Sequence, residues 1–338
     1  FFRPRHITKF VITFLILALP TLFSLLGVAS FRVRDVSILS PTDNWQAVAA
    51  RRFTARNWGL PDALARIFSN KLVYSTSIFV KNYLSYFSPQ FLFTQGPAEG
   101  AYGMISGRGV MYYPELLFLL GFVILLIKRP HKFHLLLLLL LLMSPLPAAL
   151  SKGPGYAANR AAVMIPFLTM ASALGALYLN KKIILLIFAF LLLNFAFFVE
   201  DYLYHAPQIN GPAMNYGWKE LIPRLKSFAD RFPDVRFSRS LSEPHIFVAF
   251  YSQMDPAVYQ RFSSTWPDFQ KQGFKFLDQY DGYFLNKYRF GDIYPEDSVT
   301  HPVLYVGKDS DFPSDFPEYF HIDYPNGLPA IKVAEKLP

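Results

Sequence analysis

The stretch HKFHLLLLLLLLMSPLPAAL, residues 131–150, decides how this chain can fold. It contains eight consecutive leucines, so a helix through it is apolar on every side and has no face for water. A helix needs about 17–25 apolar residues to cross a bilayer core about 30 Å thick, and this stretch is near that length. The alternative is a helix buried in a very large soluble core. Three more apolar runs lie around it, and together the four occupy residues 114–127, 134–150, 161–179 and 183–199.

A fifth apolar run, residues 10–29, follows a basic N-terminal segment. A cleavable signal peptide is the alternative for this run, but no clean cleavage signal follows it. We therefore expect a polytopic α-helical membrane protein with about five transmembrane helices and a C-terminal extracytoplasmic α/β domain. The chain begins with Phe1 rather than methionine, and we expect it to be a piece of a longer protein.

Basic clusters predict the orientation of these helices. With five helices, the clusters at residues 3–9, 128–132 and 180–182 all lie on one side, which the positive-inside rule makes cytoplasmic. The chain then divides into four expected parts. These are a transmembrane helix (1–29), an extracytoplasmic loop with amphipathic helices (30–113), a four-helix transmembrane block (114–199) and an extracytoplasmic α/β domain (200–338).

The segment 30–113 is too long for a simple connection. A helix is expected from about Asp43 to Arg56, and Pro61 is suited to open a second one. Residues 71–87 carry aromatic side chains among polar ones, which is typical of a helix at a membrane surface. A glycine-rich loop, residues 96–109, follows, but it lacks the Gly-Lys-Ser/Thr pattern of a nucleotide-binding P-loop.

Helical and strand patterns alternate after residue 200, which favours a small α/β domain. Its four histidines show no metal-ligand spacing, and no dinucleotide, zinc-protease or serine-hydrolase motif is present. Such a domain is expected to be a recognition module rather than the catalytic unit. The expected helices are 216–231 and 244–251, and the expected strands are 235–239, 282–288, 303–306 and 331–333.

Composition restricts the classes of function further. The net charge of +9 could indicate a nucleic-acid partner, but in a membrane protein it is better explained by topology, so we expect none. The chain has no cysteine, which excludes disulfides, thiolate metal sites and a cysteine nucleophile. No metal site can be assigned from the sequence, and a divalent ion stays an open alternative.

The outward loop between the second and third runs of the block, SKGPGYAANR (residues 151–160), carries the most unusual charges. Lys152 and Arg160 stand on the side where the positive-inside rule disfavours cations. Bound lipid phosphate would explain them, because arginine gives bidentate contacts and lysine a point charge. The alternative is headgroup anchoring by snorkelling side chains. Tyr156 is a candidate helper, and Arg108 is a weaker further candidate for phosphate binding.

The chain also resembles a known family at several places. Residues 83–93 (YLSYFSPQFLF), 113–116 (YPEL) and 159–162 (NRAA) followed by Pro166 are similar to the later part of bacterial GT-C glycosyltransferases. These are relatives of protein O-mannosyltransferases and of the lipid A aminoarabinose transferase. Residues 215–220, 247–251 and 255–260 resemble the extracytoplasmic C-terminal domain of such proteins. The family often has Arg-His in the glycine-rich loop, where this chain has Tyr102 and Gly103.

The resemblance implies transfer of a sugar from a polyprenyl-phosphate donor to a lipid, glycan or protein acceptor. The reaction would take place at the outer face of a bacterial inner membrane. By matching position, it gives Arg160 a donor-phosphate contact, with Lys152 and Tyr156 as helpers. The family's aspartate base lies in the first outer loop, so no catalytic residue is assigned, and the base is expected outside this chain.

Two other classes of function remain open from the sequence. A non-catalytic membrane anchor that displays the C-terminal domain to a partner would explain the apolar runs and the domain without a recognisable motif. A lipid transporter would require polar or charged residues inside the membrane helices, and the apolar runs contain almost none.

Overall fold

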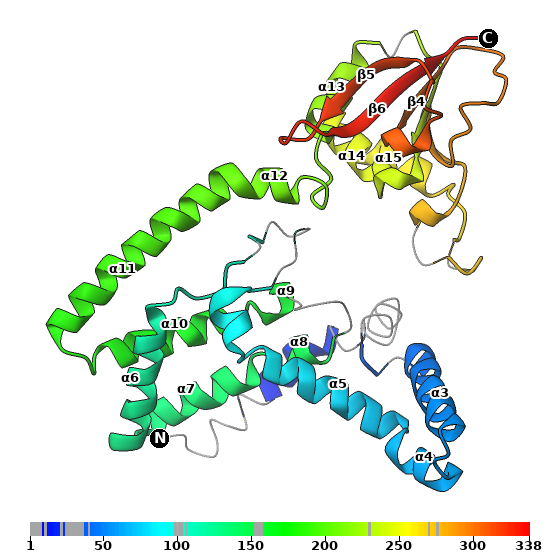
Figure 1. The fold of residues 1–338 in the computed structure, drawn as a ribbon. Coiled ribbons are helices and arrows are strands. Elements are labelled where there is room, and N and C mark those ends of the chain that lie inside the picture. The colour runs from blue at the N-terminus through cyan, green and yellow to red at the C-terminus, as the bar shows by residue number, and fades with distance from the viewer. Residues whose placement is uncertain are drawn as a thin grey trace. The chain divides into compact units, whose positions relative to one another are not determined.

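The computed structural model describes residues 9, 12–20, 23, 37–39, 41–97, 100, 104–105, 107–151, 158–228, 231–269, 271–274 and 277–338. The chain divides into two compact units (Figure 1). Unit 1 comprises Phe1–Glu99 and Ile105–Phe197, and unit 2 comprises Gly100–Met104 and Phe198–Pro338. Each unit has hydrophobic clusters of its own.

Unit 1 is helical in its described part. Its helices are α3 (Pro41–Asn57), α4 (Asp62–Phe68), α5 (Lys71–Ser85), the π-helix η1 (Gln90–Thr94), α6 (Glu115–Lys128), α7 (Lys132–Met143), α8 (Leu146–Ala149), α9 (Ala158–Ala161), α10 (Met164–Ala176) and α11 (Lys181–Glu200), the last of which runs into unit 2.

The helices expected between residues 41 and 87 are present, with shifted ends. Helix α3 begins at Pro41, so Asp43 lies inside its first turn instead of capping it. Helix α4 follows Pro61, and its first residue, Asp62, pairs with Arg66 one turn later at 2.8 Å. Asn70 caps α5 by accepting a hydrogen bond from the backbone N–H of Val73 at 2.9 Å.

The expectation of about five transmembrane helices is wrong for the described chain. Among the described residues, only the helical stretches Lys132–Ala149 and Lys181–Asn210 are long and apolar enough to cross a membrane. Helix α6 has 14 residues and α10 has 13, so each is about 20 Å long at 1.5 Å per residue, against about 30 Å of hydrocarbon. The run 10–29 lies largely outside the described residues.

The predicted run 161–179 was too long because its apolar sequence continues through a backbone break. A turn at residues 162–163 separates α9 from α10, so the run 161–179 does not form one helix. The run 114–127 is bounded by Pro114 and Pro130, and α6 is confined between them. Apolar composition alone therefore overestimated the length of α10, whereas α11 is longer than its run 183–199.

Helices α6 and α10 make the most extensive helix–helix contact among the described elements. Gly121 of α6 faces Gly175 of α10, and a Cβ built on Gly121 would lie 2.5 Å from the Gly175 carbonyl oxygen. Two facing glycines allow this backbone approach, as small residues do in apolar helix pairs. Beside them, Phe122, Leu137 and Ala171 form a buried cluster that adds α7 to the pair.

A second buried cluster joins the segment after α5 to the start of α10. Its members come from distant parts of unit 1: Tyr86, Phe91, Leu92, Phe93, Met111, Leu141, Ala148, Ala149, Ala161, Met164 and Leu168. The backbone N–H of Met111 donates to the Leu92 carbonyl at 2.8 Å, which fixes the chain after the glycine-rich loop against η1. Arg108 and Arg160 lie close in sequence to two members of this cluster, Met111 and Ala161.

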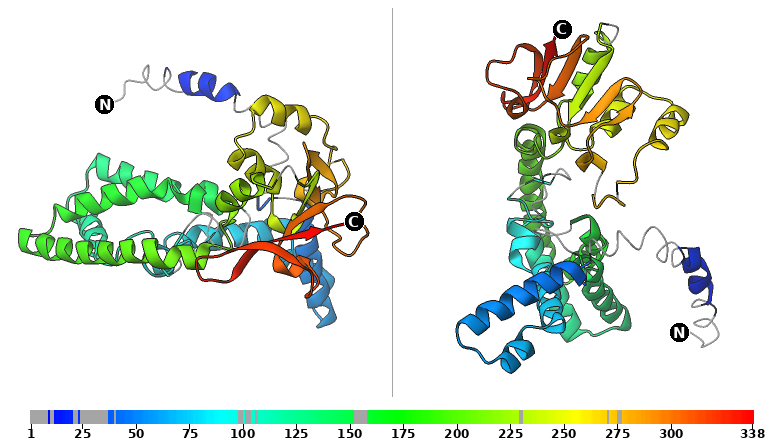
Figure 2. Two further views of the ribbon diagram at one scale, coloured as in Figure 1. Left: turned by 90° about the horizontal axis from the view of Figure 1, so that it is seen from above. Right: turned by 90° about the vertical axis from the view of Figure 1, so that its right-hand side faces the viewer.

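Unit 2 contains one six-stranded mixed sheet with the order β2-β3-β1-β4-β6-β5 (Figure 2). Strand β1 pairs in parallel with β3 and β4, and the other neighbours are antiparallel. The strands are β1 (Asp234–Ser238), β2 (Tyr283–Leu285), β3 (Tyr288–Gly291), β4 (Val303–Gly307), β5 (Glu318–Asp323) and β6 (Pro329–Lys336). The helices are η3 (Asp201–His205), α12 (Ala206–Asn210), α13 (Trp218–Lys226), η4 (Arg239–Leu241), α14 (Pro244–Tyr251), α15 (Pro256–Ser263), η5 (Leu277–Gln279) and η6 (Asp309–Asp311).

The core of unit 2 is built from aromatic side chains between the sheet and α13. Phe237 of β1 is fully buried, with ring centroids 5.7 Å from Trp218 and 5.5 Å from Phe290. Helix α13 buries Leu221, Ile222 and Leu225 on one face, as helical spacing requires. This core holds fixed the backbone at Trp218, where the chain enters the domain.

His245 makes the stability of unit 2 depend on pH. The side chain is 6% exposed, its Nδ1 is hydrogen-bonded to the Tyr283 hydroxyl at 2.9 Å, and burial lowers its pKa to about 4. In the unfolded chain the pKa is about 6.5, so between pH 6.5 and 4 only the unfolded state takes up the proton. We expect acidification through this range to remove about 3 kcal/mol of stability.

Urea unfolding of the full chain, followed by tryptophan fluorescence, checks this expectation, because Trp266 contacts the His245 ring and Trp218 lies in the core of the same unit. A His245→Gln variant should show a smaller loss of stability between pH 7 and pH 4, whereas the exposed His301→Gln control should behave like the parent. An identical pH slope in the parent and in His245→Gln would contradict the assignment.

Candidate functional site

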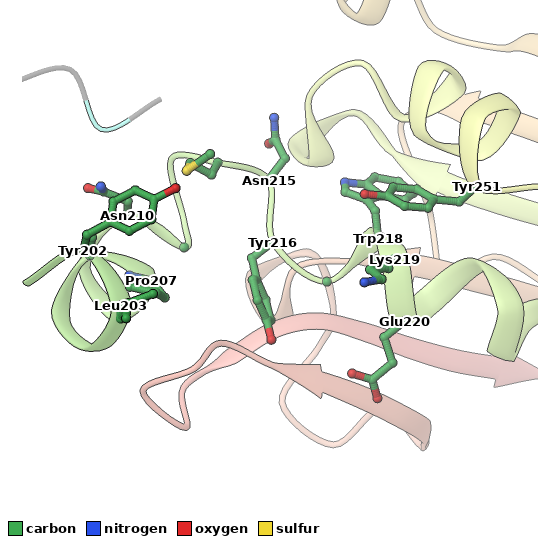
Figure 3. Close-up of a pocket in the computed structure, with 14 residues that line it drawn as sticks. Tyr202, Leu203, Pro207, Asn210, Asn215, Tyr216, Trp218, Lys219, Glu220 and Tyr251 are labelled. Atoms are coloured by element: carbon green, nitrogen blue, oxygen red, sulfur yellow. The ribbon is translucent and has the colours of Figure 1, made fainter. Parts of the chain in front are cut away.

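A cleft of about 950 Å³ in unit 2 adjoins the start of the α/β domain (Figure 3). Tyr251 comes from α14, and every other lining residue lies between residues 202 and 220. The lining residues are Tyr202, Leu203, Ala206, Pro207, Asn210, Gly211, Met214, Asn215, Tyr216, Gly217, Trp218, Lys219, Glu220 and Tyr251.

The backbone between α12 and α13 gives the cleft its shape. Asn215 (φ 52°) and Gly217 (φ 102°) both adopt left-handed conformations. Asparagine and glycine tolerate this region better than other residues. A Cβ at position 217 would also approach Ile331 Cδ1 at 3.1 Å, so glycine lets the chain turn closely over β6. Residues 215 and 217 are left-handed, so the chain turns sharply on both sides of Tyr216, and Tyr216 lies in the wall of the cleft.

The cleft combines aromatic walls with neutral and charged polar groups. Tyr216 is 42% exposed, and its ring centroid lies 6.2 Å from that of Tyr324. Asn210 is buried, and its side-chain nitrogen donates to the Met104 carbonyl at 2.9 Å. Lys219 and Glu220 complete the polar lining. Tyrosine rings with amide and charged neighbours are suited to a polar ligand that also has apolar faces, such as a sugar.

The predicted phosphate-binding loop is only partly described. Lys152 and Tyr156 lie outside the described residues, so their expected helper roles stay predictions. Arg160 lies in α9 and is partly buried next to Ala161, a member of the second buried cluster of unit 1. Arg160 makes no hydrogen bond or ion pair with the described residues.

Arg108, the weaker candidate, lies near two other polar groups. Its charge acts on Tyr112, whose pKa is raised by burial despite this cation. The backbone N–H of Tyr112 donates to Glu115 Oε2 at 2.7 Å. Burial raises the pKa of the Glu115 carboxyl, and this hydrogen bond opposes the shift. Gly96 (φ 60°) allows the chain to pass directly against the Arg108 carbonyl, where a side chain would overlap it.

Sequence reasoning missed Glu115 as part of this group. An acid in the first turn of an apolar helix has an obvious structural role, since it complements the helix dipole. Its sequence spacing from Arg108 carries no signal, because the residues between them form no helix. Arg108 and Arg160 also flank the same buried cluster, because Met111 and Ala161 are both members of it.

One group of side chains in unit 2 could hold a divalent cation. Glu200, Asp201 and His205 offer ligand atoms within 4.8 Å of one another. The π-helix η3 brings the first and last of them together, because residues five apart fall on the same face of a π-turn. Glu200 Oε1 and His205 Nε2 already pair at 2.8 Å in an exposed position. An ion would have to replace that pair.

Comparisons with family models, with curated proteins and with solved structures found no match for this chain.

Proposed function

We propose that the chain belongs to a membrane-embedded glycosyltransferase that uses a polyprenyl-phosphate sugar donor. The acceptor would be a lipid, a glycan or a protein at the outer face of a bacterial inner membrane. The observation that carries the proposal is Arg160, a partly buried guanidinium without a described acidic partner. It lies between the apolar helical stretch Lys132–Ala149 and the apolar helix α10.

Membrane embedding is supported by the stretch Lys181–Asn210. Its 30 residues are about 45 Å long at 1.5 Å per residue, which exceeds the hydrocarbon thickness. Within α11, only Ile187 is buried, and Leu185 is 71% exposed. Water is an unfavourable environment for so many exposed leucine and phenylalanine side chains. A lipid environment removes that cost.

Basic residues at the start of α11 support the orientation. Lys181 and Lys182 begin this helix. The positive-inside rule places its start in the cytoplasm, so α11 leads the chain outward into unit 2. Unit 2 would then lie on the extracytoplasmic side.

The chemistry of the reaction explains the need for a cation. The bond between the sugar C1 and the phosphate oxygen breaks, and the bonding electrons leave with the polyprenyl phosphate. The acceptor oxygen forms the new bond to C1, and its proton passes to a base. A guanidinium beside the phosphate stabilises the charge that develops on this leaving group. In this proposal Arg160, which lies next to the start of the apolar helix α10, takes that role.

Ligand binding to the full chain in nanodiscs tests the proposal. Polyprenyl phosphate and the uncharged polyprenol have the same apolar tail, so only the phosphate contact separates them. We expect the phosphate to bind about tenfold or more tightly, as expected for a charge-assisted hydrogen-bonded contact. Equal binding of the two lipids, together with no release of polyprenyl phosphate from a polyprenyl-phosphate sugar, would reject the proposal.

The second candidate function is a membrane anchor that displays a binding domain, and the unit 2 cleft favours it. We expect Tyr216→Ala to weaken the binding of short oligosaccharides about tenfold, because stacking on the exposed ring is lost. Titration of the full chain with neutral and acidic oligosaccharides, followed by intrinsic fluorescence, measures this effect. Tyr294→Ala is the matched control, since Tyr294 is 52% exposed in the same unit but does not line the cleft.

Binding in the cleft without sugar transfer would favour the anchor. Equal titration curves for the parent and Tyr216→Ala would remove the cleft as a sugar site.

A further inference from the structure

Helices α3, α4 and α5 have almost no core of their own. From residue 45 to residue 85, the buried side chains are Val48, Ala65, Ser69 and Ser75. Two small apolar residues and two serines bury far too little surface to hold three helices together in water. The three helices therefore need another surface to cover them.

Each of the three helices also presents exposed apolar side chains at helical spacing. Trp45 and Phe53 are two turns apart on α3, with Ala49 between them. On α4 the exposed large apolar residues are Leu64, Ile67 and Phe68, and on α5 they are Leu72, Val73, Val80 and Leu84. Trp58, which follows α3, is 89% exposed. These apolar stripes remain largely exposed, although Arg52 and Lys71 lie over the Trp45 ring and α5 packs an adjacent face on the second buried cluster.

The same helices are strongly basic. Residues 45–85 contain six cations and one acid, which gives a net charge of +5. A groove of about 710 Å³ between α3 and α4 combines both features, since Trp45 and Phe53 line it together with Arg52, Arg56 and Arg66. Asp62 pairs with Arg56 at 3.4 Å and with Arg66 at 2.8 Å. Three guanidinium groups share one carboxylate there, so an anion would find excess positive charge.

Helix α5 is attached to the end of the apolar stretch Lys132–Ala149. The Tyr83 hydroxyl donates to the Leu142 carbonyl at 2.9 Å, and Asn82 Nδ2 donates to the Ala149 carbonyl at 3.2 Å. If that stretch crosses a bilayer, its C-terminal end reaches the headgroup layer. Residues 82 and 83 then lie at the same depth. Attachment at this depth favours a lipid surface over a soluble partner for α3, α4 and α5.

We propose that α3, α4 and α5 lie in the headgroup layer of an anionic phospholipid bilayer. The exposed aromatic and aliphatic side chains contact the acyl chains, and the arginines and lysines contact the lipid phosphates. The inference rests on the membrane embedding in the proposed function, and goes beyond it by assigning a lipid-binding surface outside the long apolar helices.

Site-directed spin labelling tests the proposal directly, because the chain contains no cysteine. Labels at Phe53→Cys and Trp58→Cys probe the proposed surface in nanodiscs that contain phosphatidylglycerol. Leu185→Cys on α11 reports the bilayer interior, and Lys271→Cys in unit 2 reports water, since Lys271 has an exposed side chain. The readout is the ratio of collisions with oxygen to collisions with a water-soluble nickel chelate.

We expect the ratios at positions 53 and 58 to exceed the ratio at position 271 by about threefold or more. Water-like ratios at 53 and 58, together with a lipid-like ratio at 185, would overturn the inference and leave membrane embedding intact. That result would indicate a soluble partner for this surface. A water-like ratio at position 185 would reject membrane embedding, and the inference with it.

Charge removal tests the anionic part of the proposal. Arg51 and Lys81 are exposed, and neither makes a described ion pair, so Arg51→Gln/Lys81→Gln should leave the helices folded. We expect this variant to lower the ratio at position 58 about twofold in phosphatidylglycerol discs and to change little in phosphatidylcholine discs. Lys271→Gln/Lys287→Gln removes the same charge from unit 2 and should have no effect. Equal ratios in both lipids for every variant would overturn the anionic preference.

Discussion

Gly175→Ala is expected to destabilise unit 1 by about 3 kcal/mol, because the added methyl group would overlap the Phe118 carbonyl oxygen on α6. Alanine is intrinsically better than glycine inside a helix by about 1 kcal/mol. The clash is with backbone, which cannot move aside as a flexible side chain can. The helices would have to separate, and the contacts of the Phe122 cluster would be lost with them.

Thermal unfolding of the purified chain in detergent measures this effect. Ala173→Val is the matched control, since Ala173 is exposed on the same helix, and the variant adds more volume than Gly175→Ala does. The control should unfold within a degree or two of the parent. A stability of Gly175→Ala equal to that of the parent would show that α6 and α10 do not approach as closely as described.

The helices of residues 41–85 could be predicted because their signals are local. A proline starts α3, a proline precedes α4, and Asn70 caps α5, and each of these acts within a few residues. The same approach failed for the apolar helices that were expected to cross a membrane. Hydropathy reports solvent preference and is insensitive to the turn at residues 162–163, so it merged separate helices into one run.

In unit 2 as well, the elements that local sequence determines were predicted, and those that depend on distant contacts were not. The helix expected at residues 244–251 is found at those residues, and β1 and β4 agree with the predicted strands within one residue. The single strand expected over residues 282–288 is instead the hairpin of β2 and β3, because Asn286 adopts a left-handed conformation (φ 58°). Strand β5 was not predicted at all.

Strand β5 was missed because its sequence, EYFHID, carries charged and polar residues at its exposed positions. It exists through its pairing with β6, which buries Phe320 and Ile322. The unit 2 cleft could not be predicted for a related reason. Its shape depends on two left-handed residues and on Tyr251 from a helix more than thirty residues away. Neither feature produces a periodic pattern in the sequence.

Replacement of Arg160 is expected to have the largest effect on activity. We expect Arg160→Ala to lower kcat/KM for the polyprenyl-phosphate donor about 100-fold in the full-length protein, because one stabilising contact to the leaving phosphate is lost. Arg160→Lys keeps the charge but loses bidentate geometry, so it should recover part of that loss. Arg129→Ala, an exposed arginine before α7, is the matched control and should retain parental activity.

The pattern among these variants separates a phosphate contact from a packing role. Arg160 adjoins the buried cluster through Ala161, so its truncation could loosen α9 without any ligand contact. Loosened packing would lower thermal stability in Arg160→Ala and Arg160→Lys alike, and would weaken the binding of polyprenyl phosphate and of polyprenol equally. A phosphate contact lowers only the binding of the charged lipid and leaves the melting temperature unchanged. Parental activity and parental phosphate affinity in Arg160→Ala would exclude Arg160 from the donor site.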